Sequence, residues 1–361
     1  MEEKGKKGRM DCTLLLIVVF LVVIGLVILY STSAYNGQVK FHDSFYYLKK
    51  QAFATVLGIV LMLFVAGMDY HIWQRLAVFG YLAAVALSVA VMLFGREING
   101  SKRWLALGPF SFQPSEFAKV ALILFLADLV TKNVKTIGKM WTLCRIMFWI
   151  LPIVGLVGAS NLSTAIIILG IGVILIFVAS PKYAQFALMG LAGACFMGLF
   201  LALESYRLER LAIWRNPEKY EKGYQTLQGL YAIGSGGVFG VGLGNSVQKL
   251  GFVPEAQNDM IFSIICEELG LAGAGIIVFL FLLLIWRFFM IASGSRDLFG
   301  ALIATGAMAH MMIQVILNIA VVTNTIPNTG ITLPFISYGG TSVMFLLIEM
   351  GLVLSVSQVV D

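Results

Sequence analysis

Three carboxylates stand at the entrance to, or inside, one strongly apolar segment. The stretch VPEAQNDMIFSIICEELG (253–270) places Asp259 before the apolar run and Glu267 and Glu268 within it. Asp259 stands at the expected start of a helix. An aspartate at that position can cap the first-turn amides, and the helix dipole favours its negative charge. At a water–lipid boundary the same position suits a general base, because partial burial raises the pKa of a carboxyl group towards a useful value. Both interpretations stay open on the residues alone.

Glu267 and Glu268 lie about 12 Å further along the expected helix. A carboxylate at that depth in a membrane is costly unless it is paired or faces a wet cavity. Glu116 and Lys119 are candidate partners, since residues three apart on a helix share a face. These residues predict either a buried Glu–Lys network or the wall of a substrate cavity. Glu349, inside the last apolar run, allows the same two interpretations.

Two polar loops combine basic residues with a tryptophan. Such a combination at an interface usually anchors a protein in lipid. Two clusters on one face also suit a phosphate or pyrophosphate headgroup. The clusters are Lys102 and Arg103 beside Trp104, and Arg207, Arg210 and Arg215 around Trp214.

Two glycine-rich segments are further candidates for a binding site or an unusual backbone path. In ISYGG (336–340), Ser337, Gly339 and Gly340 precede the last apolar run, where small residues let backbone amides approach a ligand and a helix N-terminus attracts anions. The stretch GSGGVFGVGLGN (234–245) follows no expected strand, so it is not a nucleotide-binding loop. Its glycines indicate a tight re-entrant path, which is tolerated where protein or water covers the backbone.

Membrane-spanning helices must position these residues. The chain has 361 residues, 59% hydrophobic and 12% charged, about half the charged fraction of a soluble domain. Apolar runs of about 18–25 residues recur, each long enough to cross a bilayer. The expected fold is all-α, a polytopic integral membrane protein of about ten helices in one domain (1–361). The expected spans are 12–34, 51–67, 73–94, 115–131, 142–159, 163–180, 183–203, 260–289, 298–320 and 339–358.

An even number of spans places both termini on one side. Lys and Arg are more frequent in the short loops on that side, which predicts cytoplasmic termini in the cell membrane. The basic tail 1–11 precedes a run too long for a secretory signal, so a retained helix is expected. The loops 95–114 and 204–258 then face outward, the latter between the seventh and eighth helices. Any chemistry is expected on this outer face.

Composition excludes several kinds of site. The four cysteines lie in apolar runs without a CxxC pair and the three histidines are dispersed, so no metal cluster is expected. The net charge of +6 comes from scattered basic residues, so nucleic acid is not an expected partner. No internal repeat is evident, which weighs against a transporter built from inverted repeats.

Three long motifs resemble the RodA/FtsW/SpoVE family of shape, elongation, division and sporulation proteins. They are NGSKRWLALGPFSFQPSEFAK (99–119), GYQTLQGLYAIGSGGVFGVGLGNSVQKLGFVPEAQNDMIFSIICEELG (223–270) and TGITLPFISYGGTS (329–342). The resemblance implies a peptidoglycan glycosyltransferase that polymerises lipid II beside a class B penicillin-binding protein, which crosslinks the glycan. PEAQND and the third motif look closer to the division and sporulation branch, and we expect a role in division.

The resemblance also implies roles for single residues. Asp259 matches the family's essential aspartate, Lys102 and Arg103 fall in its basic outer motif, and Glu116 and Lys119 match a functionally important pair.

The chain departs from the family pattern at two positions. Asn161 stands where an aspartate often stands, so no catalytic charge is assigned there. Gln257 stands where a histidine is frequent, which argues against a required imidazole beside Asp259.

In the expected mechanism, Asp259 takes the proton of a sugar 4-OH and cations stabilise the departing lipid pyrophosphate. The expected cations are Lys102, Arg103, Arg207 and Arg210. A divalent cation such as Mg²⁺ or Mn²⁺ would assist at the pyrophosphate, although no ligand set is evident. The alternatives are a lipid II flippase that uses the same cavity and a non-enzymatic scaffold for the penicillin-binding protein.

Overall fold

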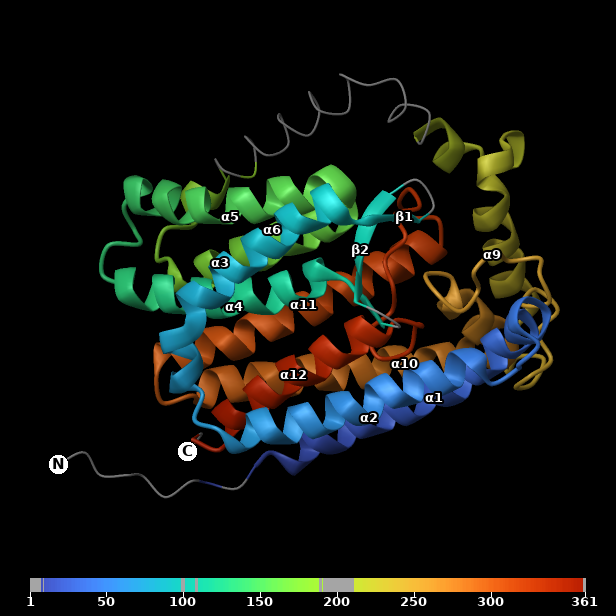
Figure 1. Ribbon diagram of the computed structural model, residues 1–361, viewed down its shortest axis with the longest axis horizontal. Coiled ribbons are helices and arrows are strands. Elements are labelled where there is room, and N and C mark those ends of the chain that lie inside the picture. Colours follow the sequence, from blue (N-terminus) through green and yellow to red (C-terminus); the bar gives the residue numbers. More distant parts are fainter. Residues whose placement is uncertain are drawn as a thin grey trace.

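The computed structural model describes residues 8, 10–98, 101–107, 110–187, 190 and 211–359. Long helices run side by side through most of this part of the chain, and α9 stands at one end of the bundle (Figure 1). The helices are α1 Cys12–Phe41, α2 Tyr46–Gly67, α3 His71–Phe94, α4 Pro114–Asn133, α5 Met140–Ser160, α6 Leu162–Ala179, α9 Tyr224–Ser235, α10 Ile261–Gly294, α11 Leu298–Val322 and α12 Gly340–Ser357.

The described helices confirm an all-α, multi-pass membrane protein. Eight of them, all except α4 and α9, are long and apolar enough to cross a membrane. Helix α4 occupies the predicted span 115–131, but four charged side chains lower its hydropathy. The predicted span 183–203 falls largely outside the described residues, and the other nine predicted spans each coincide with a helix.

Three strands and a helix appear where loops are expected. Strand β1 (Arg96–Ile98) pairs antiparallel with β2 (Ser101–Leu107), which pairs antiparallel with β3 (Phe110–Phe112). Two of these strands have only three residues, too short for an alternating pattern to reveal them, yet their pairing satisfies backbone groups of the loop. Helix α9 lies within the predicted loop 204–258 and packs against α10.

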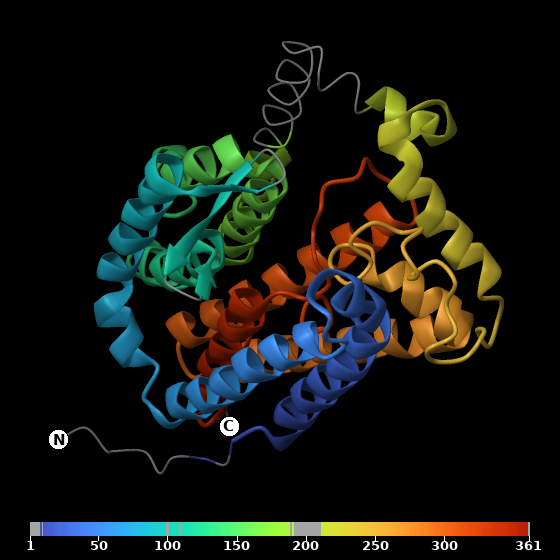
Figure 2. The same cartoon turned by 45° about the vertical axis from the view of Figure 1, so that its right-hand side comes forward.

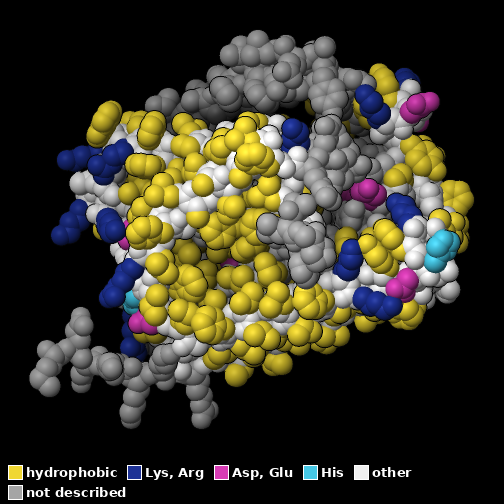
Figure 3. Space-filling view, viewed as in Figure 1, with side chains coloured by type: hydrophobic (Ala, Val, Ile, Leu, Met, Phe, Trp, Pro, Cys, Tyr) yellow, Lys and Arg dark blue, Asp and Glu magenta, His cyan; other side chains and the backbone are white. Residues whose placement is uncertain are grey.

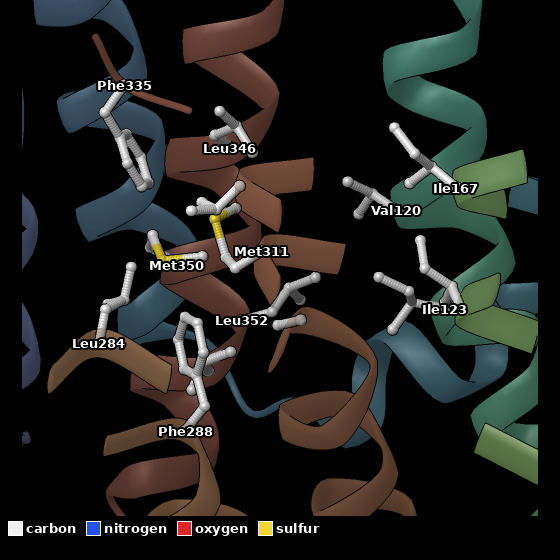
Figure 4. Packing of buried hydrophobic residues seen from close by; sticks show 14 of the residues in the cluster. Val120, Ile123, Ile167, Leu284, Phe288, Met311, Phe335, Leu346, Met350 and Leu352 are labelled. Carbon is white, nitrogen blue, oxygen red and sulfur yellow. The ribbon is translucent and has the colours of Figure 1, made fainter. Parts of the chain in front are cut away.

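Helix α4 lies at the centre of the bundle. It contacts α3, α5, α6, α11 and α12, and its residues 118–127 are buried on all sides. Figure 4 shows Val120 and Ile123 of α4 facing Ile167 of α6, with Met311 of α11 towards α12. A Cβ at Gly306 of α11 would crowd the Ile123 side chain. Small residues of this kind let membrane helices approach closely.

The bundle exposes an apolar surface to its surroundings. Hydrophobic side chains cover the middle of the face in Figure 3, and Lys and Arg side chains gather at its two ends. Phe64, Phe79 and Leu93 are each exposed over about two thirds of their surface. A soluble protein rarely exposes so large a contiguous apolar area, so this face contacts lipid.

The two ends of the described chain lie together. The Gly8 amide donates to the Gln358 carbonyl at 2.7 Å, and the Asp11 amide donates to the Ser357 hydroxyl at 3.2 Å. The Asp11 carboxylate pairs with Arg287 near the C-terminal end of α10. Asp259 precedes the first residue of α10, so it lies at the end of the bundle opposite both termini.

Candidate active site

Asp259 is a half-buried carboxylate where the loop 253–259 meets α10. The N-cap position of α10 is Met260, and no side chain caps it, so the capping interpretation of Asp259 does not hold. The Gln225 side chain of α9 donates to Asp259 Oδ1 at 3.3 Å. On the other side a Cβ at Gly330 would lie 3.8 Å from Oδ2, so the segment 329–333 closes over the carboxylate.

Burial raises the pKa of Asp259 to about 6, well above the usual 3.8. Desolvation is the largest cause, and the nearby Glu255 carboxylate adds to it. Hydrogen bonds from the Gln225 side chain and from backbone amides oppose the shift. A carboxyl group with this pKa is ionised at neutral pH and still binds a proton readily, as a general base must.

Asn318 of α11 holds the backbone around Asp259. Its Nδ2 donates to the Asp259 carbonyl at 2.9 Å and to the Ile331 carbonyl at 2.7 Å. One fully buried amide therefore joins the loop before α10 to the segment before α12. The position of the Asp259 carboxylate depends on this connection.

Buried polar oxygens without a hydrogen-bond partner in the described part of the protein gather near Asp259. They are Asn258 Oδ1, Asn318 Oδ1 and Thr329 Oγ1. Native proteins leave few buried polar atoms unpaired, and each such atom calls for an explanation. A bound polar molecule with several hydroxyl groups would supply the missing donors and acceptors.

Glu116 and Lys119 form a buried ion pair on α4. The Lys119 Nζ lies 2.9 Å from Glu116 Oε1 and 3.2 Å from Gln314 Oε1. The Ser342 hydroxyl of α12 donates to Glu116 Oε2 at 2.8 Å. The pair is nearly inaccessible to solvent, so its charges are balanced within the protein.

This ion pair continues into a histidine and a second glutamate. Gln314 donates from Nε2 to the Thr332 carbonyl at 3.1 Å, which turns its Oε1 towards Lys119 and His310. The His310 Nε2 must then donate to that oxygen at 2.8 Å. Its Nδ1 lies 2.8 Å from Glu349 Oε2, within hydrogen-bond distance.

Sequence reasoning missed the polar residues of α11 that extend this network. His310, Gln314 and Asn318 are spaced by four residues and so lie on one face of α11. That spacing in an otherwise apolar helix was a usable signal. The three residues connect the buried ion pair to the Asp259 loop over about 12 Å of helix. Gln225 carried no such signal, because its helix was expected to be loop.

Glu267 and Glu268 have other partners than those expected. The Glu268 carboxylate binds Lys249 Nζ at 2.6 Å and the Ser31 hydroxyl at about 2.8 Å. The Glu267 carboxylate accepts from the Ser246 hydroxyl and from the Val247 amide at 3.0 Å. A buried Glu–Lys pair does form, but with the glycine-rich loop and not with Glu116 and Lys119.

The ISYGG turn is braced by protein groups. The Gly339 amide donates to Gln51 Oε1 at 3.1 Å, and the Ser337 hydroxyl accepts from the Leu333 amide at 2.8 Å. The Tyr338 amide donates to the Gln257 carbonyl at 2.9 Å. The Gly339 amide is therefore engaged within the protein, while a Cβ at Gly340 would press on Ala54.

Two of the four predicted cations, Lys102 and Arg103, lie within the described residues. Arg103 is half-buried and donates from Nε to the Ser160 carbonyl at 3.0 Å, beside a small pocket that Asn161 and Ser115 also line. Lys102 is exposed on β2. Arg207 and Arg210 lie outside the described residues. Asn161 caps α6 through Oδ1, which accepts from the Thr164 amide at 3.2 Å.

The second tryptophan cluster does not fit a lipid anchor. Trp214 donates its indole N–H to the Asn324 carbonyl at 2.9 Å, and the Asn324 side chain donates from Nδ2 back to the Trp214 carbonyl at 3.2 Å. The indole therefore fastens the first part of the predicted loop 204–258 to the turn after α11. Arg215 beside it is exposed.

The fold and the site together define a class of protein. This is a multi-pass membrane protein with a half-buried carboxylate at the end opposite its termini and a buried ionic network behind it. The family model described as "Cell cycle protein", which covers FtsW, RodA and SpoVE, matches residues 12–361. The chain belongs to this family.

Similar proteins span almost the whole chain. Stage V sporulation protein E of Bacillus subtilis is 40% identical, with 98% of each chain covered. The probable peptidoglycan glycosyltransferase FtsW of Trichlorobacter lovleyi is 35% identical over 96% of this chain and 93% of that protein.

Solved structures share the fold. One, described as "structural coordination of polymerization and crosslinking by a peptidoglycan synthase complex", matches with a TM-score of 0.82 at 30% identity, covering 96% of this chain and 97% of that chain. The rod shape determining protein RodA of Thermus thermophilus matches with a TM-score of 0.71 at 28% identity, covering 96% of each chain.

Proposed function

We propose that this chain is a peptidoglycan glycosyltransferase that polymerises lipid II, with Asp259 as the general base. Its FtsW relatives carry the name of that activity, and the family match extends from residue 12 to residue 361. The observation that carries the role of Asp259 is a half-buried carboxylate with a pKa of about 6 among unpaired polar oxygens. Such a group accepts a proton at neutral pH, and those oxygens would orient a sugar.

In the proposed reaction the Asp259 carboxylate accepts the proton that the acceptor sugar loses. Asp259 takes the proton of the acceptor 4-OH while that oxygen forms a bond to C1 of the donor sugar. The bond from C1 to the lipid pyrophosphate breaks, and the pyrophosphate departs with the electron pair. Asp259 ends the step protonated and returns the proton to solvent, since its pKa lies near 6.

Cations would stabilise the charge that grows on the leaving pyrophosphate. Lys102 and Arg103 are the proposed contacts within the described residues, because β2 presents them at the same end of the bundle as Asp259. Arg207 and Arg210 are proposed for the same role. Arg103 is already oriented by the Ser160 carbonyl, which lowers the cost of placing a guanidinium.

Other site residues would hold the geometry. Glu116 and Lys119 would fix α4 against α11 and α12, because their ion pair reaches Gln314 and Ser342. Ser337, Gly339 and Gly340 are proposed to shape the wall over the substrate, with small side chains that leave room for it. Gln225 and Asn318 would act as positioning residues for Asp259.

The described residues show no group of three His, Cys, Asp or Glu side chains that could hold a metal ion. A divalent cation such as Mg²⁺ or Mn²⁺, if used, would therefore be held mainly by the substrate phosphates. Activity after chelation and after Mg²⁺ or Mn²⁺ is restored tests that proposal.

The orientation and the partner complete the proposal. Cytoplasmic termini would place Asp259 on the outer face of the cell membrane, where glycan is assembled. The proposed partner is a class B penicillin-binding protein, in keeping with the structural neighbour that coordinates polymerization and crosslinking. Division is the proposed role, although the B. subtilis relative is named for sporulation.

Polymer formation separates the proposed enzyme from its alternatives. The chain and its partner, purified in detergent, should convert labelled lipid II into glycan polymer. A flippase makes no polymer, and flipping needs two compartments. A scaffold predicts that Asp259 variants still complement a deletion strain. Absence of polymer with active partner and substrate would overturn the proposal.

A further inference from the structure

The glycine-rich loop of residues 236–252, here called the glycine loop, is inserted into the hydrogen-bond ladder of α10. At Gly270 the helix leaves helical geometry, with φ 66° and ψ −169°. The Glu267 and Glu268 carbonyls, which a regular helix would pair with the amides of residues 271 and 272, accept instead from Val241 at 2.9 Å and Gly242 at 3.0 Å.

The freed amides of α10 also find partners in the loop. Leu271 donates to the Gly237 carbonyl at 3.0 Å, and Ala272 donates to the Val238 carbonyl at 2.9 Å. Four loop bonds thus replace two helical ones, so the two carbonyls and two amides named above are all paired. This satisfies the condition for irregular backbone at membrane depth.

Glycine is required where the two segments meet. A Cβ at Gly240 would overlap the Glu268 carbonyl, and a Cβ at Gly236 would overlap the Cys266 carbonyl. Gly240 also has φ 78°, a conformation that other residues rarely adopt. The carboxylates of Glu267 and Glu268 then fix the far half of the loop through Ser246 and Lys249. The loop is a built element in which Ser246 and Lys249 are turned inward, while Asn245 is exposed.

Its apolar side chains point outward. Residues 236–248 contain no charged side chain, and Phe239 is 83% exposed. The exposed apolar side chains include Val238, Phe239, Val241, Leu243, Val247 and Leu250. They continue the lipid-facing surface of α10, where Leu271 is 71% exposed and Ile276 57%.

The depth of the loop matches the edge of a bilayer. Arg287 and Asp11 pair where α10 approaches the termini, which marks one boundary. From residue 287 to residue 270 the helix rises about 26 Å, against a hydrocarbon thickness of about 30 Å. Figure 2 shows the loop, in gold, between α9 and the ends of α1 and α10. The loop therefore lies at the edge of the hydrocarbon opposite the termini.

We propose that the glycine loop is seated in that edge of the bilayer, with lipid acyl chains covering Phe239 and its apolar neighbours. The loop then acts as an interfacial anchor beside the site, independent of the reaction. Amphipathic elements bind at this depth by burying apolar side chains about 5–10 Å into the headgroup and acyl boundary. A protein partner that covers the same surface is the competing occupant.

Site-specific fluorescence in liposomes tests the proposal. In a full-length chain with Cys12, Cys144, Cys195 and Cys266 replaced, Phe239→Cys is labelled with an environment-sensitive dye. The matched control is Lys219→Cys, an exposed site on η1 (Pro217–Lys219) of the same outer loop. The liposomes contain phosphatidylcholine and phosphatidylglycerol, with nitroxides near the headgroup or near the end of the acyl chain.

The proposal expects headgroup-level nitroxides to quench the dye at 239 at least about twofold more than the dye at 219. Aqueous iodide should quench the dye at 219 more than the dye at 239. Equal iodide quenching at both sites would overturn it. So would protection at 239 that appears only after a penicillin-binding protein is added, because the partner would then be the occupant. Leu243→Cys, 50% exposed, repeats the measurement if the first variant does not fold.

Discussion

The side-chain amide of Asn318 binds the backbone carbonyl of Asp259 at 2.9 Å and that of Ile331 at 2.7 Å. A buried residue near the C-terminal end of α11 thus sets the position of the proposed base. The same face of α11 carries Gln314 and His310, which reach the ion pair of α4. Changes deep in the membrane should therefore be felt at the site.

Asn318→Ala removes both of these hydrogen bonds and should lower the polymerisation rate about 10- to 100-fold, because small misplacements of a base are costly. The loss should fall mainly on kcat, because Asn318 positions Asp259 through the backbone, and KM should rise as well, because Asn318 Oδ1 is one of the oxygens proposed to orient the sugar. The control is Asn133→Ala, at the C-terminal end of α4 and so at the end of the bundle opposite Asp259. It should change the rate less than about twofold. Equal losses in both variants would remove the positioning role.

The pH dependence of polymerisation should report the Asp259 carboxyl group. Because the base works only when ionised, the rate should fall as the pH drops through about 6. Glu255→Gln removes a carboxylate that raises the pKa of Asp259, so its profile should shift to lower pH. Rates measured from pH 4.5 to pH 8 at saturating lipid II, about two pH units around that midpoint, would show it. An unmoved midpoint in the variant would argue against Asp259 as the titrating group.

Asp259→Asn should stabilise the protein at neutral pH. The folded-state pKa is raised from 3.8 to about 6, so the folded protein binds the proton more tightly and its stability falls as pH rises through that window. Above pH 6 the ionised carboxylate costs roughly 1–3 kcal/mol, discounted for its partial exposure. Unfolding midpoints in nanodiscs should be higher for the variant at pH 7.5, with the gain vanishing below about pH 4. A less stable variant at pH 7.5 would contradict the burial account.

The Lys249–Glu268 pair should matter more than a surface pair. Lys249→Met leaves a buried carboxylate without its cation and should cost about 3–5 kcal/mol, and Glu268→Gln should cost a similar amount. The double variant should lose less than the sum. The control is Lys49→Met, whose exposed pair with Asp43 should be worth at most about 1 kcal/mol. Denaturant titration of the parent chain, the two single variants and the double variant closes the cycle, and additive losses would refute the coupling.

Much of the fold could be predicted because apolar runs of spanning length are unambiguous. Nine predicted spans coincide with helices, and the many glycines of residues 234–245 predicted the tight path by which this stretch meets α10. The strands at 96–112 and helix α9 escaped because short elements in polar loops have no periodic pattern. Their formation depends on neighbours that are distant in sequence.

The site was only partly predictable for the same reason. Asp259 stood out as a charge beside an apolar run, and Glu116 with Lys119 stood out by their spacing. Glu268 was paired with the wrong lysine, because the true partner Lys249 lies in a loop whose return to α10 cannot be read from local residues. The contact of Gln225 with Asp259 depends on the packing of α9 against α10, which the sequence did not predict.

The rate of glycan polymerisation by Asp259→Asn tests the central claim most directly. Asparagine keeps the size and shape of the side chain but cannot accept the proton. With its partner and labelled lipid II, the variant should form no polymer, while remaining folded and at least as stable as the parent chain at pH 7.5. Polymer at the parent rate would show that another group activates the sugar hydroxyl.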